Sequence, residues 1–339
     1  MQSTVFWKKT QMTSTATTLV AGKVATATVA AARARGRLPL QSKKKAFYST
    51  SSSSAPPQPD PRYDSPINAP LSTLPAHLDL PPPRKPGESL FGYYFKIGKG
   101  YLSFYKTGLK NAAWVNPRLA GPVMSRWRDD RGYAGIVQNK WITRCDLQLL
   151  KRNQHDFRRI PLFAVLFTVC GEFTPFVVAL FSNIVPITCR IPSQIESDRK
   201  KREHRIKASF EAFLPSTSIN RPVEGLDKLT WKEKVHCSTV VGRHSGLWPS
   251  RILPLPFGFV LHKRLRRYEI YLSTDDLLIA KGGGVMKLSP PELGIACVDR
   301  GIRVLGKSEQ QLRAELQRWL TDSKKGVTIW ERWLALPTS

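Results

Sequence analysis

This 339-residue sequence has no closely paired cysteines and few acidic residues. Its five cysteines occur singly, with no C-x-x-C pair and no histidine pair at metal-ligand spacing, so neither a disulfide framework nor a zinc site is predicted. Only 25 Asp and Glu stand against 53 Lys and Arg, which gives a formal net charge of +28. Such an excess favours anionic partners, namely nucleic acid, anionic lipid or an import system that takes basic leaders.

Catalytic signatures are also missing. Across the C-terminal half we find no Ser/His/Asp or Cys/His arrangement and no acidic pair with a set of partners. The three glycines at 282–284 are not followed by the Gly-Lys-Ser/Thr of a phosphate-binding loop. We therefore predict no enzymatic activity, no cofactor and no metal site.

The first 59 residues contain no Asp or Glu, whereas lysines and arginines are spread among Ala, Thr, Ser and Val. Acid-free, basic, Ser-rich leaders form cationic amphipathic helices and are typical of mitochondrial transit peptides. We predict a transit peptide over residues 1–50 within a disordered N-terminus. Eleven prolines between Ser51 and Gly87 then predict an extended linker that takes no part in a core.

Membrane-proximal helices are predicted over residues 88–159. Aromatic residues return at helical intervals over 88–115, and four lysines share one helix face. They are Lys96, Lys99, Lys106 and Lys110. Two interpretations stay open: a helix lying on an anionic membrane surface, or a helix with a buried aromatic stripe and solvated lysines. Further on, Thr143-x-x-Asp146 predicts the capped start of another helix.

The longest apolar run follows Arg159, and Glu172 is its only side chain charged at neutral pH. At 1.5 Å per residue, residues 161–186 reach about 39 Å as a helix, against a hydrocarbon core of about 30 Å. We predict one transmembrane helix over residues 160–187, kinked at Pro175. The denser basic cluster follows this span, which predicts a single-pass protein of the mitochondrial inner membrane with its C-terminal domain in the matrix.

An acid at mid-bilayer depth costs several kcal/mol if it is ionised and unpaired, so Glu172 has two open interpretations. In the functional one it handles protons or cations, with Pro175 and Asn183 as further candidates. In the structural one it is protonated and bonded to the carbonyl that Pro175 frees, or to the same residue of a second copy. A single span cannot enclose an ion pathway alone, so the functional interpretation requires a homo-oligomer or another partner.

Residues 190–320 are predicted to form an all-helical domain, followed by a tail at 321–339. The indications are a basic run at 199–213, a predicted helix at 229–241, a basic helix start at 263–267, and capping boxes at Ser289-x-x-Glu292 and Ser308-x-x-Gln311. Asp275 and Asp276 can be metal ligands, but capping of a new helix and compensation of its dipole explain them better.

Basic side chains in this half are the candidates for binding ribosomal RNA or lipid headgroups, because both present phosphates. These candidates are Arg199, Lys200, Lys201, Arg202, Lys263, Arg264, Arg266, Arg267, Arg300 and Arg303.

Two separated segments carry a more specific set of motifs. The first holds Arg144, Asp156, Arg159-Ile160-Pro161, Glu172-Phe173-x-Pro175 and Leu180-Phe181-x-Asn183-x-x-Pro186. The second holds Asp275-Asp276-Leu277-Leu278-Ile279, Leu288-x-x-x-Glu292-Leu293-x-x-Ala296-Cys297-x-x-Arg300-Gly301-Ile302, Leu312-Arg313 and Leu316-x-x-Trp319-Leu320. In this order, the two segments resemble the LETM family of mitochondrial inner-membrane proteins.

The resemblance covers about residues 90 to 320. It implies a single inner-membrane span, a matrix-facing helical domain termed ribosome-binding-like, and roles in cation/proton exchange and in coupling mitochondrial translation to membrane insertion. After Leu320 the sequence has neither a leucine-zipper coiled coil nor the D-x-[DN]-x-[DN]-G loop of an EF-hand. Calcium sensing is therefore not carried over.

We accordingly expect an all-α protein of the mitochondrial inner membrane whose basic domain binds the mitochondrial ribosome. It would support translation, membrane insertion and ion homeostasis, with inner-membrane lipids as further partners. The alternative is a potassium/proton exchanger, or an essential subunit of one, that uses Glu172.

Overall fold

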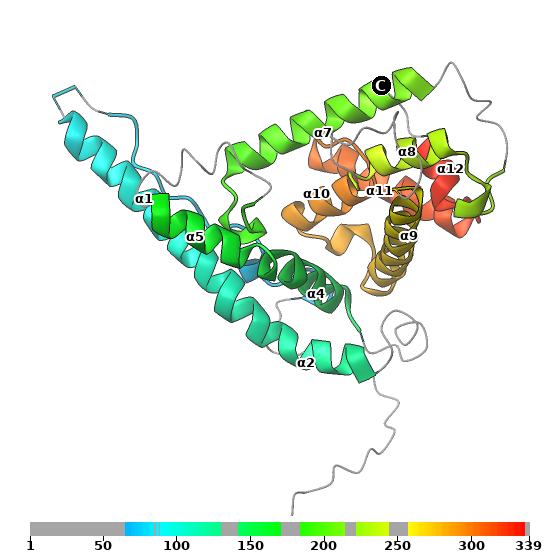
Figure 1. The fold of residues 1–339 in the computed structure, drawn as a ribbon, viewed down its shortest axis with the longest axis horizontal. Coiled ribbons are helices and arrows are strands. Elements are labelled where there is room, and N and C mark those ends of the chain that lie inside the picture. Colours follow the sequence, from blue (N-terminus) through cyan, green and yellow to red (C-terminus); the bar gives the residue numbers. More distant parts are fainter. Residues whose placement is uncertain are drawn as a thin grey trace, which may run out of the picture. The chain divides into compact units, whose positions relative to one another are not determined.

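Helices make up all the regular structure in the part of the chain that the computed structural model describes (Figure 1). This part is residues 65–84, 86–87, 89–129, 142–170, 184–213, 222–243 and 257–335, which belong to one unit, and the predicted transit peptide lies outside it. The α-helices are α1 (Leu90–Lys110), α2 (Asn116–Asp129), α4 (Arg144–Phe157), α5 (Ile160–Cys170), α7 (Pro192–Phe213), α8 (Trp231–Val240), α9 (Phe257–Lys281), α10 (Pro290–Asp299), α11 (Glu309–Lys324) and α12 (Ile329–Leu334). Shorter elements are the 3-10 helices η1 (Leu71–Thr73), η4 (Ile187–Cys189), η6 (Leu226–Lys228) and η7 (Val285–Lys287), and the π-helix η2 (Asn111–Val115). The all-α class is thus confirmed.

Local capping signals fix several helix starts. Thr143 caps α4 and Ser308 caps α11, each in a reciprocal box with the side chain three residues later, as predicted. Thr230 and Thr328 cap α8 and α12 in the same way. Each box satisfies two backbone N–H groups that a helix start leaves without partners, so these starts depend on short sequence motifs alone.

The main core forms among α8, α9, α10, α11 and α12 (Figure 1). Leu265 and Leu272 of α9, Cys237 of α8 and Cys297 of α10 are fully buried in it. Burying one leucine side chain contributes about 1.5–3 kcal/mol, so this cluster is the main source of stability for the C-terminal helices.

The core continues past residue 320, where the sequence analysis predicted a tail. Trp330 and Trp333 of α12 are 1% and 0% exposed. The ring of Trp333 stacks on Tyr268 at a centroid distance of 6.2 Å, and its indole N–H donates to the carbonyl of Arg300 at 3.2 Å. The predicted domain end was too early because α12 is short, and its two tryptophans were not recognised as core residues.

Part of the predicted linker also belongs to the core. Ile67 is 1% exposed and lies in the main cluster, although residues 51–87 were predicted to take no part in a core. The amide of Asn68 donates to the carbonyl of Lys287 at 3.0 Å and accepts from the N–H of Ser289 at 2.9 Å. The prediction was wrong here because it weighed composition, whereas one isoleucine and one asparagine are sufficient to anchor an extended segment.

A second cluster joins α1 to α5 and η4. Tyr105 of α1 packs against the rings of Phe163 and Phe167 of α5, with centroids 6.1 and 6.4 Å apart. Gly108 permits the close approach of η4 to α1, because a Cβ at that position would lie 2.5 Å from the carbonyl oxygen of Thr188. The aromatic residues of α1 are divided: Phe104 and Tyr105 are buried, while Phe91, Tyr94 and Phe95 near the helix start are exposed.

The predicted transmembrane helix is described only at its two ends. Helix α5 begins at Ile160 as predicted, but residues 171–183, with Glu172, Pro175 and Asn183, lie outside the described residues. Residues 184–186 form a turn before η4, so the predicted helix does not extend to residue 187. Among the described helices, none combines the length and the apolar character needed to cross a membrane.

The ends of the apolar run lie next to each other. The carboxylate of Asp156, at the end of α4, accepts hydrogen bonds from the N–H groups of Ile187 at 2.8 Å and Thr188 at 3.4 Å. Helix α4 also contacts α9, which follows the run in sequence. Two segments in direct contact lie on the same side of a membrane. The predicted single pass, with α4 and the C-terminal domain on opposite sides, is not compatible with these contacts.

A buried histidine in α8 makes stability depend on pH. His236 is 2% exposed, its Nδ1 lies 2.8 Å from Ser209 Oγ, and burial lowers its pKa to about 4. Between about pH 6.5 and pH 4 the unfolded chain binds this proton and the folded chain does not, so stability is lost as the pH falls.

We predict that the free energy of unfolding falls by about 3 kcal/mol across this range, and that His236→Gln removes most of that dependence. Denaturant titrations at several pH values measure it, with His262→Gln as the control because His262 is 36% exposed. Equal pH dependence in wild type and His236→Gln would contradict the assignment.

Candidate functional site

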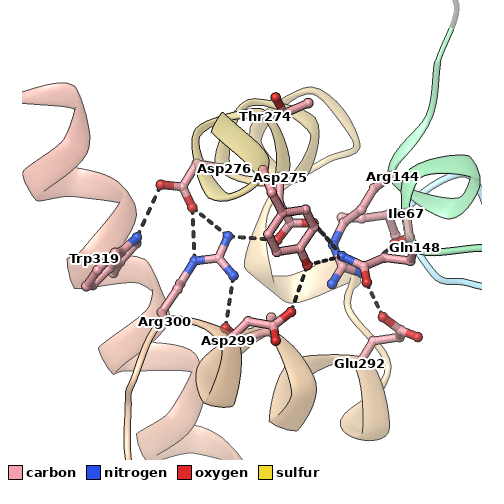
Figure 2. Close-up of polar contacts among 12 residues, drawn as sticks. Ile67, Arg144, Gln148, Thr274, Asp275, Asp276, Glu292, Asp299, Arg300 and Trp319 are labelled. Atoms are coloured by element: carbon pink, nitrogen blue, oxygen red, sulfur yellow. Dashed lines mark hydrogen bonds and ion pairs between the residues drawn. The ribbon is translucent and has the colours of Figure 1, made fainter. Parts of the chain in front are cut away.

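Asp275 and Asp276 lie in the middle of α9 and do not cap a helix. Helix α9 runs without a break from Phe257 to Lys281, so the prediction that these aspartates cap a new helix was wrong. Both aspartates are buried, at 0% and 7% exposed. A buried carboxylate needs cationic partners, and arginines from two other helices provide them (Figure 2).

Arg144 of α4 joins three segments that are far apart in the sequence. Its Nε donates to Asp275 Oδ1 at 3.0 Å, while Nη1 donates to Glu292 Oε2 at 2.9 Å and to the carbonyl of Ile67 at 2.8 Å (Figure 2). The guanidinium presents several donors in one plane, so it can bind two carboxylates and a carbonyl at once. Arg144 thereby connects the N-terminal segment and α4 to α9 and α10.

Glu292 is an ion-pair partner and not part of a capping box. Ser289 is the N-cap of α10 and Pro290 follows it, as predicted, but the Ser289 side chain makes no capping hydrogen bond. Glu292 instead pairs with Arg144 and, through Oε1, with Arg152 Nη1 at 2.7 Å. The capping prediction was wrong because two buried arginines bind this carboxylate more strongly than a backbone N–H.

Arg300 cannot bind an external anion, although the sequence analysis made it a candidate. It is 0% exposed and donates to Asp275 Oδ2 at 2.8 Å and, through Nε, to Asp276 Oδ1 at 2.9 Å. The indole N–H of Trp319 donates to the other oxygen of Asp276 at 3.1 Å (Figure 2). Arg300 therefore belongs to the interior network.

Arg144 and Arg300 keep the buried carboxylate of Asp275 ionised. Burial alone would raise the pKa of Asp275, but the charges of Arg144 and Arg300 hold it below its usual value. Burial likewise opposes the charge of Arg300, yet Asp276 and Asp275 raise its pKa. Asp275 and Arg300 are thus fixed as ions near neutral pH.

A second polar contact joins α4 to the end of α10. Lys151 Nζ lies 2.6 Å from Asp299 Oδ2 and 3.9 Å from the ring centroid of Tyr271. The hydroxyl of Tyr271 donates to the same carboxylate at 2.7 Å and accepts from Gln148 at 2.8 Å. Burial lowers the pKa of Lys151 to about 8, although Asp299 opposes that change.

Sequence reasoning did not identify the residues of α4 that complete this arrangement. Gln148, Lys151 and Arg152 follow Arg144 at steps of four, seven and eight, so all four lie on one helix face. The sequence contained one signal, the helical spacing of these polar residues. The structure shows that residues 144–150 are all buried, so this polar face lies in the interior. It could not be recognised without knowing which acids it meets.

The chemistry of this interior network is structural. Its carboxylates already accept from arginine, lysine, tyrosine or tryptophan, and the described residues contain no cluster of three metal-ligating side chains. Burial raises the pKa of the Cys189 and Cys297 thiols to about 12, which keeps these thiols protonated and poorly nucleophilic. The network therefore joins helices.

The remaining basic candidates divide by exposure. Arg202 is partly buried and donates to the carbonyls of Val240 at 2.9 Å and Val298 at 2.6 Å, so it joins α7 to the ends of α8 and α10. Arg199 and Arg303 are of intermediate exposure. The exposed candidates are Lys200, Lys201, Lys263, Arg264, Arg266 and Arg267.

Comparison with known families identifies the C-terminal helices. Residues 225–328 match the family model described as LETM1-like, RBD. No solved structure matches the chain. The matched segment contains Asp275, Asp276, Glu292 and Arg300, whereas Arg144 lies outside it, so part of the network comes from beyond the matched domain.

We predict that Arg144→Met lowers the free energy of unfolding by about 3–5 kcal/mol, because it leaves Asp275 and Glu292 buried without this partner. Arg318→Met, on the exposed face of α11, is the matched control and should change stability by less than about 1 kcal/mol. Denaturant unfolding of the full chain measures both. Similar small decreases in the two variants would contradict the role given to Arg144.

Proposed function

We propose, on the basis of the match of residues 225–328 to the family model LETM1-like, RBD, that the chain is a mitochondrial inner-membrane protein whose helical domain docks on the mitochondrial ribosome. Through this contact it supports translation, insertion of new proteins into the membrane, and ion homeostasis. The observation that carries the proposal is a row of exposed basic side chains on α9, inside the matched segment.

The first turns of α9 have the chemistry of an RNA-binding surface. Lys263, Arg264 and Arg267 are exposed and lie at steps of one and four, which places them on one face of the helix. Phe259 on the same helix is 72% exposed, and Lys263 Nζ lies 5.9 Å from its ring centroid. Basic groups can bind phosphates, and an aromatic ring beside them can stack on a nucleobase. Together these contacts suit single-stranded regions of RNA.

The membrane attachment in this proposal differs from a single pass. The apolar run after Arg159 supports entry into the inner membrane, while the contacts of α4 with α9 and α10 support one common side for both flanks. We assign that side to the matrix, where ribosomes are found. Inner-membrane lipids and a second copy of the chain are further proposed partners.

The test of ribosome docking is co-sedimentation of the full chain, in mild detergent, with mitochondrial ribosomes. We predict that Lys263→Glu with Arg267→Glu weakens binding at least tenfold. The slope of log affinity against log salt should also fall by about one for each phosphate that the variant no longer binds. The control carries the same change of charge on exposed residues at the end of α11, Lys324→Glu with Lys325→Glu.

The full chain is needed because a fragment that begins at residue 199 lacks α4 and leaves Asp275 and Glu292 without Arg144. Ribosome docking is rejected if wild type does not sediment with ribosomes at low salt. It is also rejected as a property of α9 if the α11 control weakens binding as much as the α9 variant.

A second function, cation/proton exchange, rests on one observation in the sequence. Glu172 is the only side chain charged at neutral pH in the apolar run, and an acid within a membrane segment is by default a functional hypothesis. The chain would act as a potassium/proton exchanger or as an essential subunit of one.

We predict that Glu172→Gln abolishes potassium/proton exchange in proteoliposomes or mitochondria and leaves ribosome binding unchanged. Glu211→Gln, on the exposed side of α7, is the control. Exchange at the wild-type rate in Glu172→Gln would limit this acid to a structural role.

A further inference from the structure

The first half of α1 leaves large apolar side chains in solvent. Phe91 is 82% exposed, Tyr94 65%, Phe95 63% and Leu102 50%. At about 100° per residue these four positions fall on one side of the helix. An exposed apolar stripe of this size marks an interaction site.

Lysines border this stripe on one side. Lys96, Lys99, Lys106 and Lys110 are all exposed and lie within roughly 80° of arc next to the apolar positions. An apolar stripe flanked by lysines is typical of a helix that lies in the headgroup region of an anionic membrane. There the aromatic rings enter the boundary between headgroups and acyl chains, and the ammonium groups contact phosphates.

A pocket opens beside these lysines. It has a volume of about 350 Å³ and is lined by Lys96, Lys99, Ser103 and Thr107 of α1 and by His77 and Asp79 of the preceding segment. The ammonium groups of Lys96 and Lys99 and the hydroxyls of Ser103 and Thr107 can donate to a phosphate. The two positive charges exceed the one negative charge of Asp79, so the pocket favours an anion.

Gly100 sets the width of this pocket. A Cβ at residue 100 would lie 2.6 Å from the carbonyl oxygen of Asp79 and 3.3 Å from Leu80, so only glycine lets this segment approach α1 so closely. Gly100 lies in the interior of α1, where glycine is less favourable than alanine. The close approach explains why glycine is present there.

The neighbouring helix indicates what covers this surface. Helix α5 packs on α1 through Phe163 and still exposes Leu162, Val165 and Val169, at 56%, 61% and 78%. The sequence that starts with α5 is the apolar run, whose two ends meet at Asp156. A membrane that receives this run therefore lies close to α1.

We infer that α1 binds the surface of an anionic leaflet, with Phe91, Phe95 and Leu102 in the lipid boundary and a phospholipid phosphate in the pocket of Lys96 and Lys99. The inference deepens the proposed membrane location and does not depend on ribosome docking.

The experiment uses the full chain in neutral detergent and short-chain phospholipids as probes. Calorimetric titration compares dihexanoyl phosphatidylglycerol with dihexanoyl phosphatidylcholine. Because each lysine near an anionic leaflet strengthens binding several-fold, Lys96→Glu with Lys99→Glu should weaken phosphatidylglycerol binding by roughly ten- to thirtyfold. Lys324→Glu with Lys325→Glu is the control with the same change of charge, and should bind like wild type.

A second variant tests the pocket without changing any charge. Gly100→Ala should displace residues 77–80 and also weaken phosphatidylglycerol binding. Thermal melting of each variant verifies that it is folded, and an unfolded Gly100→Ala leaves the decision to the lysine pair.

Four outcomes would overturn the inference. They are equal affinity for the two lipids, equal weakening in the α11 control, binding of inorganic phosphate as strong as that of lipid, and displacement of the lipid by a single-stranded RNA that binds more tightly. A separate measurement tests the proposed membrane location. If that location is wrong, alkaline carbonate extracts the chain from mitochondrial membranes, even when the pocket still binds the soluble lipid.

Discussion

The pairing of Arg144 with Asp275 and Glu292 is the interaction on which the arrangement of this chain depends. It carries ionised groups into a fully buried site, where removing one partner costs about 3–5 kcal/mol. Apolar packing holds α8 to α12 together, but it would tolerate small shifts between helices. Hydrogen bonds of 2.9–3.0 Å from one guanidinium fix the position of α4 against α9 and α10.

This fixed position has a direct effect on topology. Because α4 precedes the apolar run and α9 follows it, their contact places both flanks on one side of the membrane that we propose the run enters. The exposed basic residues of α9 and the aromatic stripe of α1 then lie on the same side. The surface of α9 has the chemistry to bind RNA, and the surface of α1 has the chemistry to bind lipid. In the proposed function, this arrangement holds a ribosome near a membrane surface with both flanks of the apolar run on one side.

Sequence alone predicted what is determined locally. The capping boxes at Thr143 and Ser308 follow from neighbouring residues, and the structure confirms them. The roles of Asp275, Glu292 and Arg300 were missed because their partners lie up to 148 residues away, and no local pattern indicates such a pair. The family resemblance did select these positions, since it rested on Arg144, Asp275, Glu292 and Arg300, but it gave them no physical role.

The separation of Arg144 from Glu292 also sets an order of assembly. A chain that is made and delivered N-terminus first presents α4 well before α10 exists, so Arg144 and Arg152 must stay hydrated until the last acid arrives. Contacts between residues so far apart form slowly, because a long loop has to close first. The apolar run lies inside that loop, so in the proposed membrane attachment its engagement with lipid precedes or accompanies closure of the network. Under that proposal, maturation of the domain and membrane entry are coupled steps.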